Sequence, residues 1–266
     1  MKKIYMNPFI RCLIGDLKYM MCSYRFLAAV IGYVTISLIS LLDEIKMFPS
    51  ASVCYLYMVY HYYPFWLLFL LFAVIPGGGS FCADYKSNYF RYRILRFGEK
   101  KYAISKAVSC FISASAMVFL SQWSLIAILA LRGPIYLAED KNAMIGRIYY
   151  VLMNENQVWI YFMIRILILA AAAGFFSVLA LWISTKVVNI FVVFSSPIIA
   201  YYLIDNVSIA LDIPFYLSLS KIIRGTIEIK GGITISLLYA MSVLVGLSVV
   251  FIIMFHVSCR KRCENG

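Results

Sequence analysis

The sequence predicts an all-α integral membrane protein with six transmembrane helices, on the evidence of its composition, its long apolar runs and its charge distribution. Of the 266 residues, 64% are hydrophobic and 14% are charged, whereas about 25% of the residues in a soluble domain are charged. The apolar residues gather in runs long enough to cross a hydrocarbon core of roughly 30 Å. One transmembrane domain is expected over residues 1–266, with spans at residues 25–42, 60–83, 107–131, 158–184, 187–204 and 233–257.

Lysine and arginine residues fall mainly on one predicted side of the membrane. Sixteen of the 24 lie in the N-terminal arm, the loop 84–106, the link between the fourth and fifth spans, and the C-terminal tail, against seven in the other three loops. Because positively charged loops stay in the cytosol, both termini and the loop 84–106 are predicted to be cytosolic. The net charge of +12 is therefore explained by membrane topology, and no nucleic-acid partner is expected.

The segment 4–24 is predicted to form an amphipathic helix on the cytosolic membrane surface. Asn7 and Pro8 are typical of a helix cap and of the first helical position. On a helical wheel, the apolar residues share one face while Arg11 and Lys18 share the other. Such a helix either supports a docking surface or simply anchors the chain in the membrane.

The loop 84–106 mixes basic with aromatic residues, which is unusual for a solvated segment. Its part 85–97 contains no Pro or Gly and is predicted to be helical, with Gly98 at its end. Exposed clusters of Tyr, Phe and Arg are typical of protein contact sites, but they also suit a helix whose rings lie among lipid headgroups. The predicted contact residues for a cytosolic partner are Tyr85, Tyr89, Phe90, Arg91, Tyr92, Arg93, Ile94 and Arg96.

This layout resembles the type-2 ABC transporter permease family. The resemblance rests on the six spans, on the amphipathic N-terminal helix, and on the loop in which Asp84 closes the second span and Arg96-Phe97-Gly98 precedes "YAISK". The family often has Glu where this chain has Asp84. In that family the loop carries the coupling helix, which sits in a cleft of the ATP-binding subunit.

The resemblance implies a set of partners and a direction of transport. It implies separate ATP-binding subunits that hold ATP and Mg, a second permease copy or paralogue, and a location in a bacterial plasma membrane. It also implies export of a peptide, a toxin or a drug-like molecule, and a short re-entrant or interfacial helix in the external segment 205–232.

Two features inside the predicted spans are candidates for a role in transport. Pro76 and the glycines Gly77, Gly78 and Gly79 interrupt the second span, and they are predicted to act either as a hinge or as a site of static close packing. Arg165 lies in the fourth span, where a charge is costly and usually functional. It is predicted either to snorkel or pair structurally, or to line a pathway for an anionic group.

The sequence contains no motif for catalysis or for nucleotide binding. It has no Gly-x-Ser-x-Gly turn, no His-Glu-x-x-His pair and no P-loop, so we expect no enzyme activity, cofactor site or metal site in this chain. Two alternatives to an ABC permease remain. One is an ion-gradient-driven secondary transporter or channel, and the other is a membrane scaffold for a cytosolic partner. ATP dependence and transport activity distinguish them.

Overall fold

The helices pack into an elongated bundle in the computed structural model, which describes residues 7–61, 63–137, 152, 157–214, 216–224, 226 and 232–264. These described residues form helices, turns and loops, with no strand among them. The helices are α1 (Pro8–Met21), α2 (Tyr24–Ser40), α3 (Leu42–Met47), α4 (Ala51–His61), α5 (Tyr63–Val74), α6 (Ser80–Lys86), α7 (Tyr89–Phe97), α8 (Glu99–Arg132), α11 (Val158–Ser184), α12 (Ile190–Ala210), α13 (Leu219–Arg224) and α14 (Ile233–Glu264).

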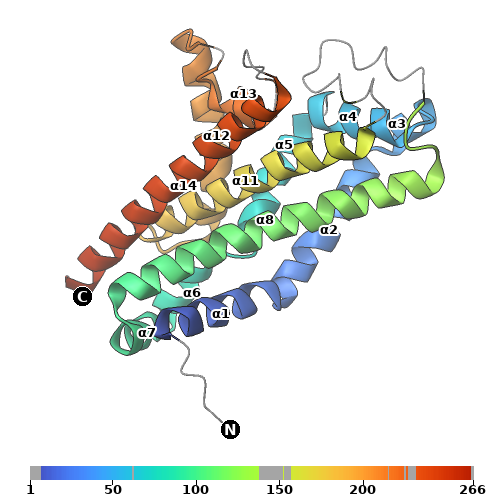
Figure 1. Cartoon of the computed structure of the whole chain (residues 1–266). Helices are drawn as coiled ribbons and strands as arrows, with labels where there is room; N and C mark the ends of the chain where they lie inside the picture. The colour runs from blue at the N-terminus through green and yellow to red at the C-terminus, as the bar shows by residue number, and fades with distance from the viewer. Residues whose placement is uncertain are drawn as a thin grey trace.

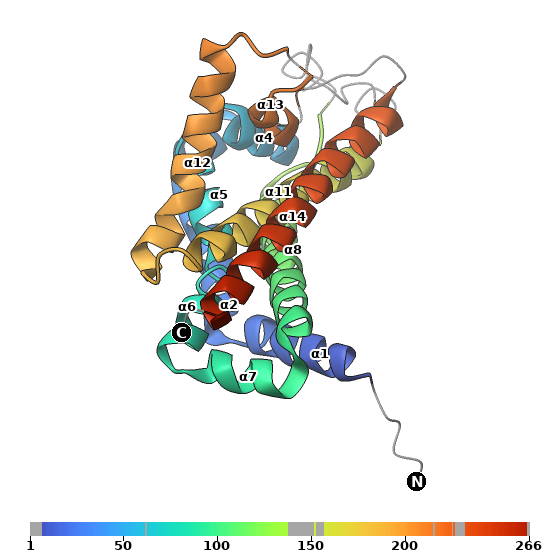
Figure 2. The same ribbon diagram turned by 90° about the vertical axis from the view of Figure 1, so that its left-hand side faces the viewer.

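The long helices have the length and composition of membrane spans. By these two criteria α8, α11, α12 and α14 could each cross a membrane, and α1 and α2, which meet at an angle of 47°, qualify as a fifth span when they are counted together. The chain is therefore a multi-pass helical membrane protein. Figure 1 and Figure 2 show α1, α6, α7 and the C-terminal end of α14 at one end of the bundle, with α4 and α13 at the other.

Helix α11 forms the centre of the bundle, and its bounds match the predicted span 158–184. It packs against α8, α14, α12 and α5. Small residues allow α8 to approach closely, since a Cβ atom on Gly174 would lie 2.6 Å from ring atoms of Phe111. The hydroxyl of Ser115 also donates to the carbonyl of Ala170 at 2.8 Å. Close packing and interhelical hydrogen bonds hold helices together in a membrane, so α8 and α11 form a tightly joined pair.

The span predicted over residues 60–83 is interrupted at Pro76–Gly79, as the sequence predicted. Helix α4 ends at His61, α5 ends at Val74, and α6 begins only at Ser80. Pro76 has no backbone N–H to continue a helix, and the turn after it is closed by a hydrogen bond from the Ser80 amide to the Gly77 carbonyl at 3.0 Å. The chain nevertheless continues towards the end of the bundle that holds α7 (Figure 1, Figure 2).

Other helices are longer than the sequence predicted. Helix α8 begins at Glu99, so that "YAISK" is its second and third turn, and α14 continues to Glu264. In the predicted external segment 205–232, the first residues belong to α12 and a short helix, α13, occurs near the middle. Residues 215, 225 and 227–231 of that segment lie outside the described residues. Helices α3 and α4 were not expected from the sequence.

Candidate functional site

Helix α7 is a short separate helix at one end of the bundle. The prediction of a single helix over 85–97 is wrong, because Asn88 adopts a left-handed φ of 56° and leaves Tyr85 on α6. The predicted end is confirmed. Gly98 has a φ of 82°, which favours glycine, and its amide donates to the carbonyl of Ile94 at 2.8 Å.

Helix α7 has a buried inner face and an exposed outer face. The side chains of Phe90 and Arg93 point into the protein, where they are only 4% and 9% exposed, whereas Tyr92 is 74% and Leu95 is 85% exposed. Two of the predicted contact residues, Phe90 and Arg93, are therefore not on the outer surface, and Ile94 is half-buried. The side chains that remain accessible are Tyr85, Tyr89, Arg91, Tyr92 and Arg96, to which the structure adds Leu95.

Phe90 attaches α7 to its neighbours through aromatic contacts. Its ring centroid lies 5.4 Å from that of Phe81 on α6 and 5.7 Å from that of Tyr102 on α8. Phe81 in turn lies 5.7 Å from Phe255 on α14. These edge-to-face pairs bury large apolar surfaces in a favourable geometry, so the inner face of α7 is joined directly to α6 and α8, and through Phe81 to α14.

Arg93 attaches α7 to α1 through a buried ion pair. Its two terminal nitrogens bind the two carboxylate oxygens of Asp16, with 3.0 Å between Nη2 and Oδ2. Ser105 on α8 donates to the same Oδ2 at 2.6 Å. Burial alone would lower the pKa of Arg93, but the hydrogen bonds and charge of Asp16 outweigh it and raise that pKa above its usual value. The guanidinium therefore stays charged, and the bidentate geometry fixes its orientation.

A second buried ion pair joins α8 to α6. The ammonium of Lys106 lies 2.7 Å from Oδ2 of Asp84, and the hydroxyl of Tyr102 donates to that oxygen at 2.9 Å. Lys106 also lies 4.0 Å from Oδ1 of Asp16, which brings the two pairs together. We refer to Asp16, Asp84, Arg93 and Lys106 as the ion network. The two positive and two negative charges of the ion network cancel, so no charge is buried without a counter-charge, which would be costly.

Sequence reasoning missed Asp16 as a partner of the loop. The predicted N-terminal helix is confirmed, with the side chain of Asn7 accepting a hydrogen bond from the Phe9 amide at 3.0 Å. The side chains that α1 buries against the rest of the protein are Cys12, Asp16 and Met20, and only Met20 of these belongs to the predicted apolar face. The one available signal was that Asp16 is the only acidic residue in the basic N-terminal arm.

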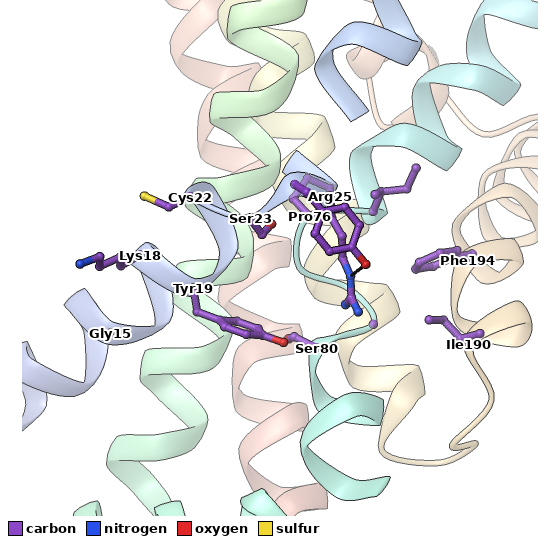
Figure 3. Close-up of a pocket in the computed structure, with 13 residues that line it drawn as sticks. Gly15, Lys18, Tyr19, Cys22, Ser23, Arg25, Pro76, Ser80, Ile190 and Phe194 are labelled. Atoms are coloured by element: carbon purple, nitrogen blue, oxygen red, sulfur yellow. Dashed lines mark hydrogen bonds between the residues drawn. The ribbon is translucent and has the colours of Figure 1, made fainter. Parts of the chain in front are cut away.

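The turn between α5 and α6 lies beside a cavity of about 560 Å³, which we call the turn cavity. In Figure 3, Tyr19 and Arg25 reach towards this cavity from α1 and α2, and Ile190 and Phe194 face it from α12. Pro76, Gly79 and Ser80 line it from the turn and the start of α6, while the side chain of Lys18 points away (Figure 3). One side of the turn between α5 and α6 therefore faces the turn cavity.

The glycines of this turn also make close packing contacts. A Cβ atom on Gly77 would lie 2.8 Å from the sulfur of Cys110, and one on Gly78 would lie 3.3 Å from Cβ of Ala180. None of the three glycines has a positive φ, so close approach explains them better than backbone freedom does. The turn combines a packed side with a side that faces the cavity, and its movement as a hinge stays a prediction.

Arg165 is completely buried and does not snorkel to the membrane surface. Its Nη1 donates to the carbonyl of Arg224, at the end of α13, with a distance of 2.5 Å. Arg224 in turn donates to the hydroxyl of Tyr201 at 3.0 Å. A cation suits the C-terminal end of a helix, so Arg165 fastens α13 to α11, and a role in a pathway stays a prediction.

No family model, curated protein or solved structure matches this chain. In the described ranges, no group of three or more His, Cys, Asp or Glu residues is placed to hold a metal ion. The fold and the site together define a multi-pass helical membrane protein with a basic and aromatic helix fixed to one end of its bundle.

Proposed function

We propose that this chain is the membrane subunit of an ATP-driven ABC transporter, and that α7 is the helix on which a separate ATP-binding subunit docks. The observation that carries this proposal is the division of α7 into two faces. Tyr92 and Leu95 are 74% and 85% exposed on the outer face, while Phe90 and Arg93 hold the helix to the bundle. Tyrosine and arginine are enriched in interface hot spots, and the charge distribution assigns this end to the cytosol.

The attachments of α7 give a partner a way to move the bundle. A displacement of α7 would reach α1 through Arg93 and Asp16, and α8 through Phe90 and Tyr102. Separating a buried ion pair is costly, so we expect α1, α7 and the start of α8 to move as one unit. Movement would then pass through α6 to the hinge at Pro76–Gly79 and to the pathway.

The remaining parts of the proposal follow from the sequence and the resemblance. The chain has no nucleotide-binding motif, so ATP and Mg would be bound by the partner subunit. Six spans are proposed, with α2 and the broken pair α5–α6 added to the four long helices. A second permease copy or a paralogue would complete the pathway in a bacterial plasma membrane. The resemblance alone supports export of a peptide, a toxin or a drug-like molecule.

The proposal is tested by purification from native membranes in mild detergent, followed by mass spectrometry and an ATPase assay. We expect a soluble protein that carries a P-loop to co-purify with the chain. The variant Tyr92→Ala/Leu95→Ala shortens two side chains on the outer face and leaves the anchors of α7 intact. It should abolish both co-purification and stimulated ATP hydrolysis while the amount of inserted protein is unchanged.

A matched control lies at the opposite end of the bundle. Tyr216 and Leu217 are 56% and 58% exposed, so Tyr216→Ala/Leu217→Ala removes the same chemistry away from α7 and should leave the partner bound. Absence of any P-loop protein from the purified complex would refute the proposal. Transport that follows an ion gradient without ATP would indicate a secondary transporter or channel. A bound cytosolic partner without transport would indicate a scaffold.

A further inference from the structure

A second cavity lies between α1, α7 and the start of α8, and we propose that it binds a phosphate-bearing anion. This cavity, which we call the basic cavity, has a volume of about 410 Å³. Volumes of roughly 300 Å³ and above are typical of sites for small molecules. Its charged lining residues are Arg11, Arg93, Arg96, Lys106 and Asp84.

The charges of the basic cavity do not balance. Arg93 is paired with Asp16 and Lys106 with Asp84. Among the described residues, the other two cations, Arg11 and Arg96, form no ion pair with a carboxylate, although Arg96 lies over the ring of Phe97. The cavity therefore has two positive charges more than it has negative ones, and these two charges come from different helices. Such an excess attracts an anion, and two arginines suit an anion with more than one acceptor oxygen.

The cavity is a built site, because its back wall consists of buried charged groups. Lys106 is 1% exposed and Arg93 is 9% exposed, and both are held in place by carboxylates. The single acid in the lining, Asp84, is engaged by Lys106 and Tyr102. Arginine side chains bind phosphate through two parallel hydrogen bonds, so Arg11 and Arg96 at the rim could hold one phosphate between them.

The position of the cavity matches two sources of phosphate. It lies at the end of the bundle assigned to the cytosol, where the headgroups of anionic lipids and free cellular phosphates are both within reach, and basic pockets between helices on this side bind lipid headgroups. Gly15 and Tyr19 line both the basic cavity and the turn cavity. The turn cavity has apolar walls at Ile75 and Phe194, which suit an acyl chain whose headgroup occupies the basic cavity.

The bound anion would act on the position of α7. It would bridge Arg11 on α1 to Arg96 on α7 and reinforce the link that Asp16 and Arg93 already make. This role does not depend on ATP or on a partner subunit, so it can be tested separately from the proposed function.

The experiment measures lipid binding to the purified full-length protein by native mass spectrometry, with phosphatidylglycerol compared against phosphatidylcholine. The variant Arg11→Gln/Arg96→Gln changes two exposed residues and should leave the fold intact, as circular dichroism would verify. We expect it to weaken phosphatidylglycerol binding by roughly tenfold or more, because charge-assisted hydrogen bonds are lost. Binding of phosphatidylcholine should be weak in both proteins.

The matched control Lys100→Gln/Lys101→Gln also removes two exposed cations at this end of the bundle, and both lie outside the linings of the two cavities. It should bind phosphatidylglycerol as the parent protein does. Equal weakening by both double variants would mean unspecific attraction and would overturn the proposal, as would unchanged binding in Arg11→Gln/Arg96→Gln. Competition by inorganic phosphate separates the sources: displacement of the lipid assigns the cavity to free phosphate as well, and no displacement assigns it to the headgroup.

Discussion

Two arginines are buried among the described residues, and they are held in different ways at the two ends of the bundle. Arg93, near the end that carries α7, faces the carboxylate of Asp16 within a network in which the charges cancel. Arg165, in the half that carries α13, faces the backbone carbonyl of Arg224. The first arrangement joins several helices through complementary charges, whereas the second fastens one short helix. We therefore expect a change at the first site to affect the whole protein and a change at the second to stay local.

The largest effect is expected from removal of the carboxylate of Asp16. In Asp16→Asn the guanidinium of Arg93 stays buried without its counter-charge, which typically costs about 3–5 kcal/mol of the free energy of unfolding. Thermal unfolding of the detergent-solubilised protein would measure the loss. A double-mutant cycle with Arg93→Gln should give less destabilisation than the sum of the single changes, and additive effects would show that the two residues do not interact.

The second test removes the side chain that fastens α13. Arg165→Met keeps the bulk of the side chain but loses the hydrogen bond to Arg224, for an expected loss of about 1.5–3 kcal/mol. Hydrogen exchange at residues 219–224 should become at least severalfold faster, while exchange in α7 stays unchanged. Faster exchange in α7 would contradict the local character of this site.

The third test compares two glycines with different surroundings. A methyl group added by Gly77→Ala would meet the sulfur of Cys110 at 2.8 Å, and such overpacking typically costs about 1–3 kcal/mol. Gly246→Ala is the control, because a Cβ at that position of α14 meets nothing within 4 Å, and alanine is the better helix former by up to about 1 kcal/mol. Comparing the thermal unfolding of both variants checks this prediction, and equal stability would mean that the turn at Gly77 is loosely packed.

The smallest effect is expected at an exposed ion pair. Lys46 and Asp43 lie 3.7 Å apart with side chains that are 76% and 94% exposed. Such pairs contribute little because water and salt screen them, so Asp43→Asn should leave thermal unfolding unchanged within error. A clear loss of stability would show that exposure is a poor guide to the strength of ion pairs in this protein.

The sequence predicted the features that depend on neighbouring residues. Asn7 and Pro8 marked the start of α1, Gly98 marked the end of α7, and hydrophobicity alone placed α11 at residues 158–184. Each of these signals acts within a few residues or along one continuous run. The left-handed conformation at Asn88 was missed because asparagine tolerates this region without requiring it.

Contacts between distant residues could not be predicted in this way. Asp16 and Arg93 are 77 positions apart, and nothing in the local pattern of either segment indicates the other. For the same reason the inward orientation of Phe90 and Arg93, and the outward orientation of Leu95, could not be predicted from the local pattern. The division of α7 into two faces depends on how α1 and α8 pack against it.

Helix α8 has a geometric consequence for any movement at the end that carries α7. It is one helix of 34 residues and therefore roughly 51 Å long at 1.5 Å per residue. Lys106 near its start belongs to the ion network, and Arg132 at its end donates to the carbonyl of Ile45 at 2.6 Å. As a lever pivoted near its start, α8 would displace its far end by about 4 Å for a rotation of about 5°. A small tilt of α8 beside α7 would therefore move the other end of α8, where it contacts α3, by more than the diameter of a carbon atom.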